Sequence, residues 1–247
     1  ILTANFFLLF AIALAISPYG KVRLGGAGAK PDFSLIGWLS MLFAAGMGIG
    51  LLFWSVGEPM THFASSVAED AGSPGSWAPL GGMAGDVEGS ARLGLAATLY
   101  HWGLQAWAIY AVVGLALALF AFNKGLPLAI RSAFYPIFGE RVWGWVGHVI
   151  DTLAVLATLF GLATSLGLGA EQINAGLAYL YGVPVSNLVK IVLISIITGI
   201  ALISVLRGLD GGVKIASEIN MGLAFLLLVV VFFIGPTSAI LSRLGDS

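Results

Sequence analysis

The sequence contains no cysteine and very few charged residues. The absence of cysteine excludes disulfides and thiolate metal sites. Charged residues make up 9% of the 247 positions, whereas soluble domains carry about 25%. The formal net charge of −1 provides no basic surface for a nucleic acid. Hydrophobic residues make up 59% of the chain and the mean hydropathy is +1.00. The composition therefore predicts a polytopic protein of the lipid bilayer, without a nucleic-acid partner.

Six segments are apolar enough for a membrane-spanning helix, which needs about 20 residues. They are residues 2–17, 35–57, 90–122, 145–170, 187–206 and 217–241. The third is long: at about 1.5 Å per residue it reaches roughly 50 Å, so it must tilt or protrude. The first is short, as a clipped span would be, and we expect a fragment of a longer protein. The fold class predicted is all-α, with residues 1–34 holding the first span and residues 35–247 the other five.

Charges in the links between these spans predict the orientation. Cytoplasmic links carry an excess of lysine and arginine. Eight of the 11 such residues follow the first, third and fifth spans: Lys21, Arg23, Lys30, Lys124, Arg131, Arg141, Arg207 and Lys214. Link 58–89 has only acidic charges and is rich in Gly, Pro and Ser, so it should be irregular and face outward. Glu58 should face water there or cap a neighbouring helix.

Several polar residues lie near the predicted ends of spans. The cytoplasmic stretch PLAIRSAFYPIFGE, from Pro127, fits a short amphipathic surface helix or an irregular loop equally well. We expect Asp151 to form a structural ion pair with Arg141 or another cation of that side. His62 and His148 should lie at the interface between the membrane and water. The spacing of His, Asp and Glu in the sequence indicates no metal cluster.

The second span contains alternate glycines, at Gly46, Gly48 and Gly50 in GMGIG. A glycine in a helix interior costs roughly 1 kcal/mol relative to alanine. Three interpretations are open. Gly46 and Gly50 form GxxxG, which allows close helix packing. The glycines could also produce a simple kink. A full break would expose backbone groups, which lipid tolerates only where they are buried or line a wet cavity.

The third span groups large aromatic residues on one helical face, within the stretch HWGLQAWAIY. At 100° per residue, Trp102, Trp107 and Tyr110 fall within roughly 140° of one another. Aromatic residues of membrane helices often form an interfacial belt. An aromatic cage is also the expected receptor of a quaternary ammonium ion, through cation–π attraction. It needs no charged side chain inside the bilayer, where charge is costly.

Three stretches, GMGIGLLFWSVGEP, HWGLQAWAIY and FGLATSLGLGAEQINAGL, together resemble the betaine/choline/carnitine transporter family. The resemblance covers essentially the whole chain. Members of this family have twelve spans, of which the last ten form the leucine-transporter fold, two inverted repeats of five helices. The resemblance implies that span 2–17 is the family's second helix and that the other five spans are the first repeat. It also implies that the second repeat and the family's first helix are not part of this sequence.

The resemblance also implies roles for single residues. The glycine stretch corresponds to the family's broken first core helix, beside substrate and sodium. In sodium-coupled members, backbone carbonyls at the positions of Ala44 and Met47 help to bind sodium. The implied substrate-site residues are Trp102, Trp107, Tyr110, Ala45, Gly48 and Gly50. Proton-coupled, choline-type relatives tend to carry aspartate at position 50, so Gly50 is similar to the betaine-type pattern.

A departure concerns a second sodium site, for which some members carry two threonines at i and i+4. Here the pair is Thr158 and Leu162, and leucine offers no side-chain oxygen. Thr158 is therefore a candidate sodium ligand, and its alternative role is a backbone or interhelical hydrogen bond.

The function implied is secondary transport of glycine betaine or a related quaternary-ammonium compatible solute, coupled to sodium. The alternative is a proton-coupled or exchanging choline or carnitine transporter. The spans lack a nucleophile–base pair typical of an enzyme. The resemblance implies further partners: the lipid bilayer, the second half of the same protein, and two further copies in a homotrimer, as in relatives. It also implies the cytoplasmic membrane of a bacterium or archaeon, and no cofactor besides the sodium ion.

Overall fold

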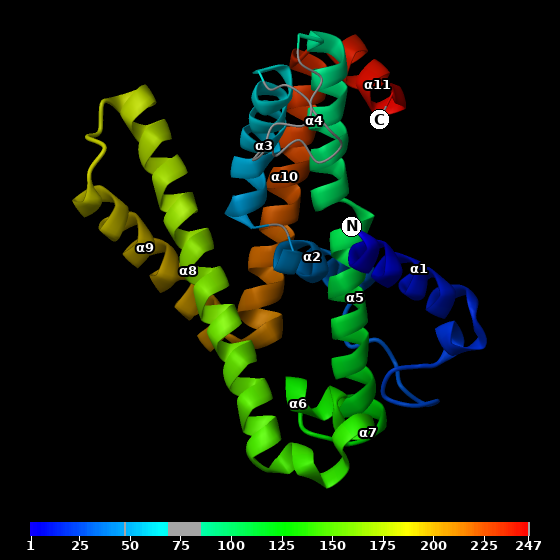
Figure 1. Ribbon diagram of the computed structural model, residues 1–247. Helices are drawn as coiled ribbons and strands as arrows, with labels where there is room; N and C mark the ends of the chain where they lie inside the picture. Colours follow the sequence, from blue (N-terminus) through cyan, green and yellow to red (C-terminus); the bar gives the residue numbers. More distant parts are fainter. Residues whose placement is uncertain (47, 69–84, 247) are drawn as a thin grey trace. The chain divides into compact units, whose positions relative to one another are not determined.

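The computed structural model describes residues 1–46, 48–68 and 85–246, and the regular elements in these ranges are all helices (Figure 1). The α-helices are α1 (Leu2–Ile16), α2 (Leu35–Gly46), α3 (Ile49–Ala68), α4 (Val87–Trp102), α5 (Leu104–Ala118), α6 (Ile130–Ala133), α7 (Tyr135–Phe138), α8 (Trp145–Tyr181), α9 (Asn187–Leu206), α10 (Lys214–Ile234) and α11 (Thr237–Asp246). Short 3-10 or π turns are η1 (Pro18–Lys21), η2 (Leu119–Asn123), η3 (Gly139–Trp143) and η4 (Leu209–Val213). The all-α prediction is confirmed for this part of the chain.

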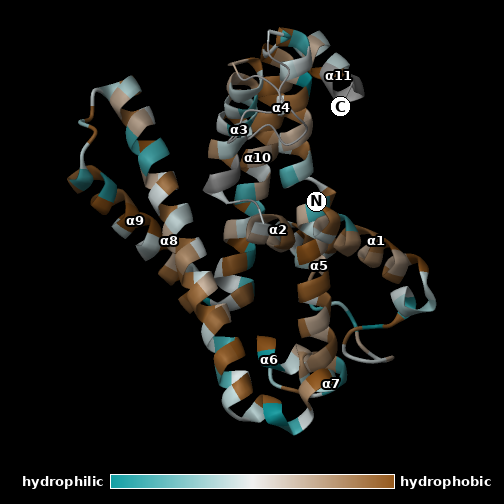
Figure 2. Cartoon of the chain, in the orientation of Figure 1, coloured by the Kyte–Doolittle hydropathy of each residue, from teal (hydrophilic) through white to brown (hydrophobic). Residues whose placement is uncertain are grey.

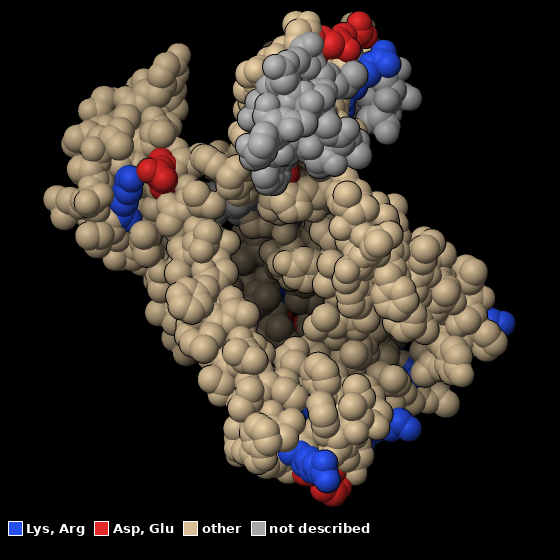
Figure 3. Space-filling model, viewed as in Figure 1, with Lys and Arg blue, Asp and Glu red and all other residues tan. Residues whose placement is uncertain are grey.

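Within the described residues, four helical segments are long and apolar enough to cross a membrane: Val87–Asn123, Trp145–Tyr181, Asn187–Leu206 and Leu209–Ile234. Two apolar helices, α1 and α2, are shorter. Figure 2 shows hydrophobic residues along α5, α8 and α10, and the face in Figure 3 carries few charges. Large apolar side chains are exposed along these helices. Such a surface suits lipid rather than water, and the protein is an integral membrane protein. The count of six spans stays a prediction.

The chain divides into two compact units, each built from two stretches of sequence. The first unit contains Ile1–Pro31 and Ala97–Gly161, and the second contains Asp32–Ala96 and Leu162–Ser247. Helices α4 and α8 therefore contribute residues to both units. The predicted boundary between residues 34 and 35 concerns the family's repeats and stays a prediction.

In the first unit, α1 packs along α5. The hydroxyl of Tyr100 donates a hydrogen bond to the carbonyl of Ile1 at 3.0 Å. The side chain of Asn123, at the end of η2, holds the link that follows α1: its amide donates to the Arg23 carbonyl at 2.8 Å, and its oxygen accepts from the Gly25 amide at 2.9 Å. One side chain thus satisfies two backbone groups of a link that is 98 residues away in sequence.

In the second unit, α2 packs against α10 through small residues. Gly37 is buried, and a Cβ atom there would lie 2.8 Å from Cε of Lys214. Ser40 is buried one turn further along α2. Its hydroxyl donates to the Ile36 carbonyl at 2.8 Å and lies 3.6 Å from the sulfur of Met221. Small residues allow two backbones to approach closely in lipid, where no hydrophobic effect drives helices together.

The same unit contains a close contact between α3 and α4. A Cβ atom on Gly94 would lie 2.8 Å from the carbonyl oxygen of Pro59. Further along, the hydroxyls of Ser66 and Ser90 are hydrogen-bonded at 3.0 Å, and both side chains are fully buried. The two helices therefore meet through a glycine and a pair of serines, so a larger residue at position 94 would push them apart.

The expectation that Glu58 faces water is wrong, and the alternative that it caps a neighbouring helix stays a prediction. Glu58 lies inside α3 and is 6% exposed, and its carboxylate lies 3.2 Å from Nε2 of His62, one turn further on. His62 is 5% exposed, so its ring is buried inside the protein, and its expected place at the membrane interface stays a prediction. A buried carboxylate needs such a partner because desolvation of a lone charge is costly. Link 58–89 was expected to be irregular, but α3 occupies it up to Ala68; residues 69–84 lie outside the described part.

Two predicted spans end in the wrong place. The fourth was expected to end at residue 170, but α8 continues to Tyr181 and stops at Gly182, whose φ of +69° is left-handed and suits glycine. The sixth was expected to reach residue 241, but α10 ends at Ile234. At Gly235 a Cβ atom would lie 2.4 Å from the carbonyl oxygen of Val231. The stretch from Pro127 forms separate short turns, α6, α7 and η3, instead of one amphipathic helix.

We predict that Gly94→Ala destabilises the protein by about 1–3 kcal/mol, because the added methyl group overpacks the α3–α4 contact against backbone. The measurement is the midpoint of thermal unfolding of the detergent-purified protein. The matched control is Gly222→Ala on α10, where an added Cβ meets nothing within 4 Å. Equal unfolding midpoints for the two variants would contradict the prediction.

Candidate functional site

The glycine stretch of the second predicted span separates two helices. Helix α2 ends at Gly46, α3 begins at Ile49, and Gly48 between them is not helical. Met47 lies outside the described residues. Of the three interpretations of GMGIG, the structure favours a break. The carbonyls of Ala44 and Ala45 belong to the last turn of α2, where carbonyl groups lack intrahelical partners and carry partial negative charge.

The aromatic residues of the third predicted span lie on both sides of another break, which the sequence analysis missed. Trp102 is the last residue of α4, Gly103 is extended, and α5 begins at Leu104. The estimate that all three aromatic residues share one helical face assumed a continuous helix. It therefore holds for Trp107 and Tyr110, which are both on α5, but not for Trp102, which lies before the break. The sequence signal for this break is weak, because it consists of the single glycine between Trp102 and Leu104.

Trp107 and Tyr110 form an aromatic pair on α5. Their ring centroids are 6.0 Å apart and the ring planes are inclined by 42°. Trp107 is 39% exposed and Tyr110 is 68% exposed, so both rings have uncovered surface within their unit. The indole nitrogen Nε1 of Trp107 donates to the carbonyl of Trp102 at 3.1 Å. This bond connects the two predicted site tryptophans across the break.

The predicted site residues fall into two groups. Trp102, Trp107, Tyr110 and Thr158 belong to the first unit, and Ala44, Ala45, Gly48 and Gly50 belong to the second. Each group is described within its own unit, and the combined substrate and sodium site stays a prediction.

Thr158 lies on α8, where its hydroxyl donates to the Ala154 carbonyl at 2.8 Å. This is the backbone hydrogen bond expected as the alternative role of the residue. A hydroxyl that donates its proton keeps lone pairs that are able to contact a cation. The role of Thr158 as a sodium ligand stays a prediction, and Leu162 is an exposed apolar side chain one turn further along. Among the described residues, no group of three or more His, Cys, Asp or Glu side chains is arranged to hold a metal ion.

The profile of a protein family described as "BCCT, betaine/carnitine/choline family transporter" matches residues 1–247. The chain belongs to this family. Its members are transporters and not enzymes.

Three relatives illustrate the similarity to known BCCT proteins. A glycine betaine/proline/choline transporter of Vibrio parahaemolyticus is 57% identical over 248 residues, which cover 99% of this chain and 45% of the relative. The glycine betaine transporter OpuD of Bacillus subtilis is 44% identical, with 100% of this chain and 46% of the relative covered. A high-affinity choline transport protein of Escherichia coli is 43% identical, with 99% and 34% covered. The chain thus spans less than half the length of these curated relatives.

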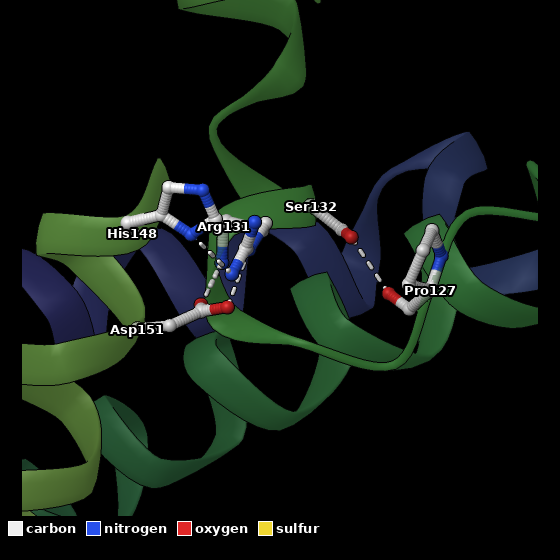
Figure 4. Close-up of polar contacts among 5 residues, drawn as sticks. All are labelled: Pro127, Arg131, Ser132, His148 and Asp151. Atoms are coloured by element: carbon white, nitrogen blue, oxygen red, sulfur yellow. Dashed lines mark hydrogen bonds and ion pairs between the residues drawn. The ribbon is translucent and has the colours of Figure 1, made fainter. Parts of the chain in front are cut away.

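In this BCCT chain, a polar cluster lies between the start of α8 and the link that precedes it (Figure 4). The carboxylate of Asp151 accepts a hydrogen bond from the backbone amide of Arg131 at 3.0 Å. It also forms an ion pair with the guanidinium of Arg131. The guanidinium also lies 3.5 Å from Nδ1 of His148. Next to it, Ser132 donates to the Pro127 carbonyl at 2.6 Å. The expected structural ion pair of Asp151 is confirmed, and its partner is Arg131 rather than Arg141.

A second contact shapes the same link. The hydroxyl of Tyr135 donates to the carboxylate of Glu140 at 2.7 Å. The nearby negative charge raises the pKa of the Tyr135 phenol above its ordinary value, first through this hydrogen bond and then through charge repulsion with the phenolate. Tyr135 therefore stays protonated, as a hydrogen-bond donor, throughout the physiological pH range.

We predict that Asp151→Asn destabilises the protein by about 1–3 kcal/mol, because the partly buried Arg131 loses a charged partner that also accepts its backbone amide. The measurement is again the thermal unfolding midpoint. The control is Glu88→Gln, since Glu88 and Arg92 form a solvent-exposed pair, and such pairs contribute little. The prediction fails if both variants unfold at the same temperature as the parent protein.

Proposed function

We propose that this chain is part of a secondary transporter that carries glycine betaine or a related quaternary-ammonium compatible solute, coupled to sodium. The observation that carries the proposal is the aromatic pair of Trp107 and Tyr110, whose rings are uncovered and lie beside a break in the helix. The printed names of the relatives, which include betaine and choline, support the same class of substrate.

The substrate site proposed is an aromatic box in which Trp102, Trp107 and Tyr110 surround the trimethylammonium group. A quaternary ammonium ion has no N–H to donate, so aromatic faces are its natural partners. Ring centroids 6.0 Å apart leave both rings within reach of one cation. The resemblance of the glycine stretch implies that Ala45, Gly48 and Gly50 are also substrate-site residues.

The sodium site proposed uses backbone carbonyls of Ala44 and Met47 and the hydroxyl of Thr158. The position of Ala44 in the last turn of α2 supports it, because the C-terminal end of a helix attracts cations. Sodium binding would stabilise the conformation that takes up substrate from outside, which couples the two fluxes. The alternative, a proton-coupled or exchanging transporter of choline or carnitine, draws support from the choline relative, while Gly50 favours the betaine type.

We propose that the working transporter contains a second five-helix repeat beside this chain, because substrate sites of such folds lie between two repeats. The leucine-transporter-like fold, the homotrimer and the cytoplasmic membrane of a bacterium or archaeon are parts of the same proposal. The tests below therefore use the full-length transporter.

We predict that uptake of labelled glycine betaine by cells expressing the full-length transporter falls to background when potassium replaces sodium, because the coupling ion is lost. Sodium-independent uptake would favour the proton-coupled or exchanging alternative. No betaine uptake in either medium would overturn the betaine assignment and favour choline or carnitine, to be measured in the same cells.

We predict that Trp107→Leu raises the apparent KM for glycine betaine about tenfold, the loss expected when a cation–π contact in a desolvated site is removed. Uptake rates are divided by the number of transporters at the cell surface, so that different expression levels of the variants do not affect the comparison. The control is Trp145→Leu, at the exposed start of α8, which should leave the KM unchanged. An unchanged KM in the Trp107 variant would refute the aromatic-box assignment.

A further inference from the structure

The break between α4 and α5 is a single extended residue. Gly103 has φ −86° and ψ −152°, while Trp102 before it and Leu104 after it belong to helices. It lies inside the apolar segment Val87–Asn123, far from either end. Backbone carbonyls near such a break lose regular helical partners, and at membrane depth they must be satisfied by other groups of the protein.

Only glycine fits this position without displacing backbone. A Cβ atom on Gly103 would lie 2.3 Å from the carbonyl oxygen of Leu99, which real Cβ atoms do not approach so closely. The clash is with the main chain and not with a movable side chain. Gly114, also in the α5 stretch, differs in this respect, because a Cβ atom there meets nothing within 4 Å.

The indole of Trp107, on α5, forms a hydrogen bond across the break to the last residue of α4. Its Nε1 donates to the Trp102 carbonyl at 3.1 Å, and the Trp107 amide bonds to the Gly103 carbonyl at 3.4 Å. Because the bond runs from the edge of the ring to backbone, it restricts rotation of the ring and leaves part of its surface exposed beside Tyr110.

We propose that Gly103 is a positioning residue of the substrate site: its break presents the Trp102 carbonyl to the indole N–H of Trp107, which sets the ring plane that receives the quaternary ammonium group. The inference rests on the proposed function, because it assumes that Trp107 binds substrate. Gly103 itself touches no substrate and acts through Trp107. Cation–π attraction depends on the cation lying over the ring face, so a rotated ring binds more weakly.

The test is a double-mutant cycle in the full-length transporter, with the KM for glycine betaine and the maximal rate per surface transporter as readouts. Gly103→Ala should raise the KM about three- to tenfold, with a smaller change in the maximal rate. Trp107→Phe, which keeps an aromatic ring but lacks the N–H, should also raise the KM. Adding Gly103→Ala to Trp107→Phe should then change the KM less than about twofold, because the bond is already absent.

Equal effects of Gly103→Ala in both backgrounds would overturn the proposal, since they would indicate a structural role independent of Trp107. An unchanged KM in Gly103→Ala would overturn it as well. Gly114→Ala is the control and should behave like the parent. An unchanged KM in both Trp107→Phe and Trp107→Leu would instead refute the aromatic-box assignment on which the inference rests, so the two failures are distinguishable.

A second variant tests the hydrogen bond directly and does not depend on the folding of Gly103→Ala. Trp107→3-benzothienylalanine keeps the size and faces of the ring, but sulfur replaces the N–H. We expect this variant to raise the KM about as much as Gly103→Ala does, and to reach the cell surface at the same level as the parent protein. A KM equal to that of the parent would show that the bond does not position the ring and would overturn the proposal.

Discussion

In a lipid bilayer every backbone amide and carbonyl must find its partner inside the protein, and the rest of this structure depends on that constraint. It explains why the apolar segments are helical. It also explains why the interruption at Gly103 has a polar group close by. At Gly103 the indole of Trp107 provides a donor to the carbonyl of Trp102. The backbone requirement and the orientation of a candidate substrate-binding ring are thereby met by the same hydrogen bond.

Small and polar residues form the contacts of α2 with α10 and of α3 with α4. Gly94 meets the backbone of Pro59, and Ser66 bonds to Ser90, in the contact between α3 and α4. The turn from α8 to α9 is closed by Asn174, whose amide donates to the Pro184 carbonyl at 3.1 Å. This pattern follows from the lipid environment. A leucine side chain is solvated as well by lipid tails as by a leucine of another helix, so apolar contacts alone do not drive helices together. Close approach and hydrogen bonds then decide which helices pair.

Hydropathy predicted some elements well and others poorly, for physical reasons. Segment 187–206 coincides with α9 because Ser186 caps a continuous apolar run. Helix α8 passes its predicted end because the polar side chains that follow, such as Glu171 and Asn174, lower hydropathy without disfavouring a helix. Glu58 was expected at the end of a span, but it lies inside α3, where its partner His62 is one turn away. The isolated Gly103 gave little warning of a break, since single glycines are often tolerated in helices.

The sequence by itself determined the membrane class, the family, most of the helices and the aromatic residues of the candidate site. These properties are local: each is contained in a run of apolar residues or in a motif of a few positions. Only the tertiary structure decided which polar groups meet. In the folded chain the ion-pair partner of Asp151 is Arg131 and not Arg141, and the Trp107 indole lies against the Trp102 carbonyl. The reason is that such partners are set by turns and breaks of the backbone, whose geometry depends on contacts between residues and not on composition.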